Sequence, residues 1–157
     1  MDSWRLGSMK RLDAAWLLWR GGNFTCALPV EHVLEVMRPL SIKVVSGSPP
    51  PLCGMTLIRG QATPVIDAGL LLGDQPTVAN YLVAIRVGSR NVALAAENVI
   101  GVRELPEGAA DLPPLLRSAA GKLISAVETL DSELLVRLQA ARLLPDAVLR
   151  SIPVGGA

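Results

Sequence analysis

The chain has 157 residues, half of them hydrophobic, and a formal net charge of +1. This length fits one domain or two very small ones, and it is long enough to bury a sizeable core. Charges of both signs are scattered and aromatic residues make up only 3% of the chain, which argues against a nucleic-acid partner because such a partner needs a basic surface and stacking platforms.

The ends of the chain give no sign of a membrane or secretory segment. No apolar run reaches the roughly 18 residues of a membrane helix, and the start lacks the order of a secretory signal, so we expect a cytoplasmic protein without direct membrane insertion. Residues 1–12 are polar and aperiodic, which predicts a flexible arm; alternatively, Trp4 is an anchor that docks on a partner. One domain is expected over residues 13–150, with a tail at 151–157.

Short apolar runs separated by turn residues predict an all-β fold, either a barrel or a sandwich. The runs cover residues 15–20, 24–28, 52–58, 62–66, 81–87, 92–96, 122–127 and 134–138. Short turns join them in pairs and predict β-hairpins, with Arg59-Gly60 between the third and fourth runs. Short helical segments are expected at residues 30–33, 68–72 and 138–150. Asp67 is expected to cap the second, and Pro145 to interrupt the third.

The chain also contains a weak internal repeat. Shifted by 66 positions, residues 17–38 align with residues 83–104 without a gap, and seven of the 22 pairs are identical. A fainter echo at a shift of 72 aligns the segments that follow Asp67 and Gln139, and a six-residue insertion within residues 106–121 would explain the change of shift. This predicts two similar subdomains packed face to face, although chance similarity between apolar segments is the alternative.

Candidate chemistry is sparse. Cys26 and Cys53 lie far apart and are expected to be buried thiols rather than a disulfide, and with His32 they cannot complete a closed four-ligand zinc site without carboxylates. An enzyme that uses either thiol is an alternative, but neither thiol lies in a motif that resembles a thiol hydrolase. No Gly-rich phosphate loop is present. We therefore expect no catalytic residue, no cofactor and no metal.

Arg59 is the sharpest candidate for a binding residue. It lies among apolar neighbours beside Gly60, so its stem is expected to be partly buried while its guanidinium reaches a carboxylate or a partner. We hypothesise that Glu35 is that carboxylate, with charged groups within about 4 Å of each other. The alternatives are a purely structural ion pair for Arg59 and a solvated carboxylate at a strand edge for Glu35.

Several segments together resemble the CheW family, the adaptors that couple chemoreceptors to the CheA histidine kinase. Residues 54–67 resemble its G-x-x-N-L-R-G and P-V-I-D elements, and residues 27–30 and 33–36 resemble its A-I-P-V and V-x-E-V elements. Leu57 departs from the pattern because the family usually has Asn there. The resemblance covers residues 14–145, nearly the whole chain.

The resemblance implies two packed SH3-like five-stranded β-barrel subdomains and a non-enzymatic scaffold. Its expected partners are the regulatory domain of a CheA-type kinase and the helical tip of a chemoreceptor, and self-association is left open. The expected receptor-binding residues are Val33, Glu35, Val36, Gly54, Arg59 and Gly60. The two valines could equally be core residues, and the two glycines could serve backbone geometry. An adaptor for a twitching-motility, biofilm or other receptor–kinase pathway is the alternative function.

Overall fold

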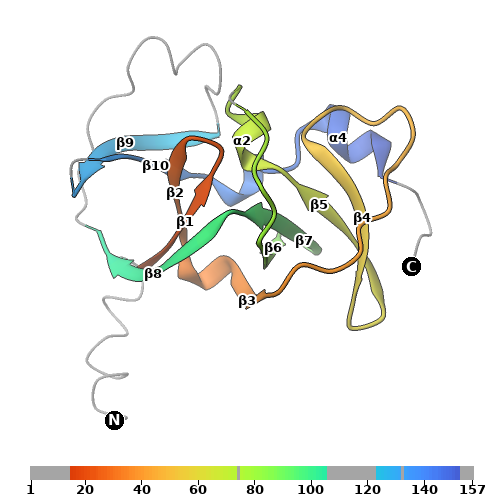
Figure 1. Cartoon of the computed structure of the whole chain (residues 1–157), viewed down its shortest axis with the longest axis horizontal. Helices are drawn as coiled ribbons and strands as arrows, with labels where there is room; N and C mark the ends of the chain where they lie inside the picture. The colour runs from red at the N-terminus through yellow and green to blue at the C-terminus, as the bar shows by residue number, and fades with distance from the viewer. Residues whose placement is uncertain (1–14, 74, 106–122, 132, 153–157) are drawn as a thin grey trace.

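The computed structural model describes residues 15–73, 75–105, 123–131 and 133–152 (Figure 1). Within these ranges the fold consists of ten strands and four short helices. The strands are β1 (Ala15–Gly21), β2 (Phe24–Pro29), β3 (Val33–Met37), β4 (Leu52–Ile58), β5 (Gln61–Ile66), β6 (Tyr81–Val87), β7 (Arg90–Ala96), β8 (Asn98–Glu104), β9 (Ile124–Leu130) and β10 (Glu133–Leu138). The helices are η1 (Val30–His32), α2 (Ala68–Leu71), η2 (Ala140–Arg142) and α4 (Asp146–Ser151). The expected arm at 1–12 and the expected insertion within 106–121 lie outside the described residues.

The strands form two five-stranded sheets, which confirms the all-β prediction. Sheet A has the order β8-β1-β2-β10-β9, and sheet B has the order β3-β6-β7-β5-β4 (Figure 1). Neighbouring strands are antiparallel except for the parallel pairs β2–β10 and β5–β7. Within the described residues each sheet ends in two edge strands that do not pair with each other, so hydrogen bonds do not close the five-stranded sheets into barrels.

The predicted duplication is confirmed by the topology. Strands β1 to β3 correspond to β6 to β8 at a shift of 66 residues, and β4 and β5 correspond to β9 and β10 at a shift of 72. Exchanging every strand for its counterpart converts the order of sheet A into that of sheet B. The irregularities agree as well, because the register shifts beside Leu34 in β3 and beside its counterpart Ile100 in β8. The halves are intertwined, since β3 joins sheet B and β8 joins sheet A.

The main hydrophobic core is shared by the two sheets. Alternate residues of the central strands fill it, among them Trp19 and Leu28 from sheet A and Ile85 and Leu94 from sheet B, all fully buried. The period-two pattern of each strand turns the intervening residues to the opposite face, where two smaller clusters form, one on each sheet. Apolar residues on both faces of the central strands account for the long apolar runs in the sequence.

Asp67 caps α2 as predicted and also ties distant segments together. Its carboxylate accepts a hydrogen bond from the backbone N–H of Leu70 at 3.3 Å and others from the N–H and Oγ1–H of Thr77 at 2.8 and 2.6 Å. Thr77 Oγ1 in turn accepts from the N–H of Gly22 at 3.0 Å, in the turn between β1 and β2. The buried carboxylate therefore joins the end of sheet B to a hairpin of sheet A.

The prediction of a helix over residues 138–150 was only partly right. Leu138 is the last residue of β10, and the helical content is split between η2 and α4. Pro145 immediately precedes α4, where its fixed φ suits a helix start but cannot continue a preceding helix. The predicted strand at 122–127 is displaced to 124–130. All described helices are a few residues long, so none of them could cross a membrane.

Candidate functional site

The turn between β4 and β5 places Arg59 in an unusual backbone conformation. Ile58 pairs with Gln61, so Arg59 and Gly60 form a two-residue loop with φ values of 51° and 79°. Positive φ at both positions is the signature of a type I′ hairpin turn, which normally carries Asn-Gly. Gly60 adopts this conformation freely, but Arg59 does so at a cost of about 1–2 kcal/mol.

Glu35 on β3 holds the guanidinium of Arg59 in a two-point contact. Arg59 Nε donates to Glu35 Oε1 at 3.0 Å and Nη2 donates to Oε2 at 3.2 Å, which confirms the predicted ion pair. The Arg59 side chain is 78% exposed, so the pair stabilises the fold by roughly 0.2–1 kcal/mol. This gain does not offset the backbone cost, and stability alone therefore does not account for an arginine at this position.

A hollow of about 310 Å³ lies beside this ion pair. Side chains from β3 to β7 and Arg59 of the turn line it, with the almost fully buried Thr63 and Ala84 as its floor and polar or charged side chains as its rim. The lining residues are Leu34, Glu35, Ile58, Arg59, Gln61, Thr63, Ala84 and Asn91. Leu34 is 53% exposed because the bulge in β3 turns it away from the regular pleat. The site thus offers apolar carbon and paired charges next to each other.

The other predicted site residues occupy different environments. Val33 packs against the main core, whereas Val36 is 41% exposed on edge strand β3. Gly54 is buried away from solvent, at a φ of 148°, and a Cβ added there would lie 2.3 Å from the carbonyl oxygen of Lys43. That close approach lets Lys43 and Met55 exchange backbone hydrogen bonds of 2.7 and 2.8 Å. Gly54 therefore serves backbone geometry in this fold.

A second hollow, apolar and about 600 Å³ in volume, was not anticipated from the sequence. It lies on the other side of the β4–β5 hairpin and is lined by Leu40, Ser41, Ile42, Lys43, Met55, Thr56, Leu57 and Ala62. Leu57 is 68% exposed and Leu40 is 40% exposed. The replacement of the usual Asn by Leu57 was the signal in the sequence, since an exposed leucine at a strand end favours a partner surface over core.

Sheet A carries an ion pair of opposite polarity at the turn that corresponds to the Arg59 turn. Asp131, the counterpart of Arg59, also has a positive φ of 50°, and its carboxylate accepts from Arg103 Nη1 of β8 at 3.2 Å. Edge strand β8 exposes Ile100 and Val102, as β3 exposes Leu34 and Val36. The internal repeat does not predict the Arg103–Asp131 pair, because Arg103 aligns with Met37 and not with Glu35.

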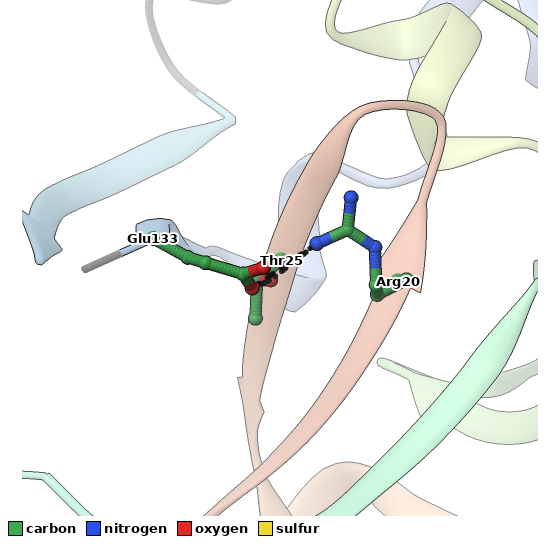
Figure 2. Close-up of polar contacts among 3 residues, drawn as sticks. All are labelled: Arg20, Thr25 and Glu133. Atoms are coloured by element: carbon green, nitrogen blue, oxygen red, sulfur yellow. Dashed lines mark hydrogen bonds and ion pairs between the residues drawn. The ribbon is translucent and has the colours of Figure 1, made fainter. Parts of the chain in front are cut away.

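A polar network across β1, β2 and β10 adjoins this counterpart site (Figure 2). Arg20 Nη1 donates to Glu133 Oε2 at 3.2 Å and to Thr25 Oγ1 at 3.3 Å, and Thr25 Oγ1 donates to Glu133 Oε2 at 3.3 Å. Sheet B has a version of this network without a carboxylate. There Arg86 Nη1 donates to Asn91 Oδ1 at 3.4 Å and Asn91 Nδ2 donates to Gln61 Oε1 at 3.5 Å.

The residues considered for catalysis form no reactive arrangement. Burial, together with the nearby Asp67 carboxylate, raises the pKa of the Cys53 thiol to about 11, so the nucleophilic thiolate is scarce at neutral pH. Cys26 is buried in the main core. His32 is paired with its neighbour Glu31 at 3.8 Å. Among the described residues, no three His, Cys, Asp or Glu side chains gather as metal ligands would.

Comparisons with known proteins agree with this geometry. The family model for the CheW-like domain matches residues 16–148. Protein FrzA of Myxococcus xanthus is 27% identical over 152 residues, which cover 94% of this chain and 95% of that protein. The crystal structure of the scaffolding protein TtCheW from Thermoanaerobacter tengcongensis superposes with a TM-score of 0.74 at 16% identity, covering 87% of this chain and 90% of the other. At that identity the superposition supports the fold alone.

Proposed function

The chain belongs to the CheW-like domain family, and we propose that it couples the cytoplasmic tip of a chemoreceptor to the regulatory domain of a CheA-type histidine kinase. Members of this family are non-catalytic scaffold proteins of chemotaxis-type signalling, so this chain is a scaffold and not a thiol enzyme. The proposed partners would place it at the cytoplasmic side of receptor arrays.

The Arg59–Glu35 site carries the receptor half of the proposal. An arginine in the left-handed region, held in a two-point ion pair yet 78% exposed, costs more stability than it returns, which favours a role in binding. The neighbouring Leu34 and Val36 expose apolar surface on edge strand β3. An apolar strip with a charged rim suits an amphipathic helix, so the proposed receptor site comprises Val33, Glu35, Val36, Arg59 and Gly60.

The apolar hollow on the other side of the β4–β5 hairpin supports the kinase half. Along the hairpin, Leu57 and Ala62 face this hollow, whereas Ile58, Gln61 and Thr63 face the hollow beside Arg59. The alternation of side chains along each strand thus places both surfaces on one two-stranded ribbon. A shift of the ribbon on binding one partner would change the surface offered to the other, which is a coupling of free energies between two sites.

Calorimetry with the wild type and Arg59→Glu tests the proposal. A purified chemoreceptor tip and a purified CheA-type kinase regulatory domain from the same organism would be titrated separately into each protein. We expect both proteins to bind the kinase domain and only the wild type to bind the receptor tip. Arg103→Glu is the matched control, because it disrupts the counterpart ion pair in sheet A and should leave receptor binding unchanged. A folded wild type that binds neither partner would refute the proposal.

An adaptor in a different receptor–kinase pathway is the second candidate. The exposed Leu57, in place of the family's usual Asn, favours a different receptor or kinase surface because it adds apolar area beside the Arg59 turn. Titration with receptor tips from several pathways of the same organism would separate the two candidates. Binding that is confined to a receptor outside chemotaxis would favour the second.

A further inference from the structure

The hollow beside Arg59 differs from its counterpart in sheet A at two floor positions. Ala84 and Thr63 line the hollow, and both are almost fully buried. Their counterparts Leu18 and Leu135 are completely buried in one apolar cluster of sheet A. Because the strand registers are the same in both sheets, side-chain size rather than backbone geometry leaves space in sheet B.

The rim charges of the two sites also differ. In sheet B, Arg59 pairs with Glu35, and Arg86 lies next to the hollow, where it donates to the lining residue Asn91 at 3.4 Å. The counterparts of Arg59, Gln61 and Arg86 in sheet A are Asp131, Glu133 and Arg20, two carboxylates and one guanidinium. With Arg59, Arg86 and Glu35 the rim of the hollow in sheet B has a net charge of +1, whereas in sheet A Arg103 and Arg20 balance the carboxylates of Asp131 and Glu133.

We propose that the hollow in sheet B is a specificity pocket for one aliphatic side chain of an acidic helical segment of the receptor. This inference rests on the proposed function. It names Ala84, Thr63 and Arg86 as the residues that determine which receptor segment binds. An aliphatic occupant fits because Leu34, Ile58 and Ala84 offer carbon, and the half-exposed Leu34 would be covered on binding.

A carboxylate on the same helical segment fits the remaining donors of the rim. Glu35 accepts from Nε and Nη2 of Arg59, so the N–H groups of Nη1 can donate to a carboxylate of a partner. Arg86 lies on the exposed end of β6 and supplies a second guanidinium. An acidic helix is attracted to this rim, whereas the carboxylates of Asp131 and Glu133 are already paired with guanidinium groups and offer it no net attraction. The pocket therefore also discriminates between the two halves of the molecule.

Filling the pocket and reversing its rim charge test the inference separately. Binding of the purified receptor tip would be measured by calorimetry for Ala84→Leu and Arg86→Glu. The matched controls are Thr129→Leu, which adds an exposed leucine to sheet A, and Arg20→Glu, the charge reversal at the counterpart position. We expect about 30-fold weaker binding for Ala84→Leu and about fivefold for Arg86→Glu at low salt, the latter loss shrinking at high salt. Both controls should stay within about twofold of the wild type.

The possible outcomes separate the pocket from the adaptor role. If folded Ala84→Leu and Arg86→Glu bind the receptor tip as the wild type does, the pocket is refuted while the adaptor proposal stands. If the wild type itself fails to bind, both are refuted. If Ala84→Leu does not fold, the comparison of Arg86→Glu with Arg20→Glu decides. Equal losses of receptor affinity from these two variants would refute the pocket. Unchanged affinity for the kinase domain is required of every variant, because a loss there would mean general damage and count against the pocket.

Discussion

Sheets A and B are two versions of one structure that share their strand order, bulges and hairpin turns and differ in many side chains. Both have the same strand order after exchange of counterparts, the same bulges at Leu34 and Ile100, and a positive φ at Arg59 and Asp131. The ion pairs at the two turns have opposite polarity, and the space beside Ala84 corresponds to a position filled by Leu18. The strand order and turns are thus retained because the shared core depends on them, whereas side chains outside that core can diverge.

The largest expected effect is at Gly54, where the two halves differ in backbone conformation. Its counterpart in β9 is Ala126, but a Cβ at Gly54 would collide with the Lys43 carbonyl at 2.3 Å while φ is 148°. We expect Gly54→Val to lower the free energy of unfolding by about 4 kcal/mol or to prevent folding. Urea denaturation measures this. Gly47→Ala, which has open space around its Cβ, is the control and should cost about 1 kcal/mol.

Leu18→Ala introduces into sheet A the side chain that sheet B has at Ala84. Leu18 is fully buried, so we expect a loss of about 3 kcal/mol in the free energy of unfolding, from lost apolar burial and the cavity left behind. Denaturant melts of this variant and of Ala84→Leu would be compared. If Ala84→Leu were as destabilising as Leu18→Ala, the space beside Ala84 would not be open to a side chain, contrary to the geometry.

Cys53 on β4 carries a titratable thiol, whereas its counterpart on β9 is Ser125. The two halves therefore contribute differently to the pH dependence of the free energy of unfolding. Burial and the Asp67 carboxylate raise the pKa of the Cys53 thiol from 9.0 to about 11, so the unfolded chain releases this proton at a lower pH than the folded one does. The protonated thiol therefore makes its full contribution to the free energy of unfolding below pH 9, and this contribution is lost between pH 9 and 11. Melting temperatures of the wild type and Cys53→Ser over this range should diverge, with the wild type falling more steeply. Parallel curves would contradict the shift.

The smallest expected effect is the coupling energy of the two exposed ion pairs. A double-mutant cycle with Glu35→Gln and Arg59→Gln should give roughly 0.2–1 kcal/mol, and the same cycle at Arg103 and Asp131 should give a similar value. Both couplings should weaken in 1 M salt because the pairs are solvent-exposed. A coupling above about 2 kcal/mol at Arg59 alone would make that pair a major element of stability and would weaken the argument for binding.

Local patterns in the sequence were sufficient for the hairpins and the Asp67 cap, whereas the Glu35–Arg59 pair was a hypothesis that the family resemblance of residues 33–36 supported. Two apolar runs separated by a short turn that contains Gly or Asn predict a hairpin, because the geometry of such a turn depends on residues that are adjacent in the sequence. Edge strands β3 and β8 were harder, since their bulges interrupt the period-two pattern that identifies a strand. The Arg103–Asp131 pair and the second hollow were missed because neither has a recurring residue type at a fixed spacing.

The sequence by itself determined the duplication, the all-β class and the family, because these depend on repeated local spacing along the chain. Only the tertiary structure decided that β3 joins sheet B and β8 joins sheet A, since the choice of partner for an edge strand depends on long-range packing. It also decided that Ala84 borders open space while Leu18 is enclosed. A small residue in a sequence predicts neither a hollow nor a filled core, because the neighbours that surround it come from strands far along the chain.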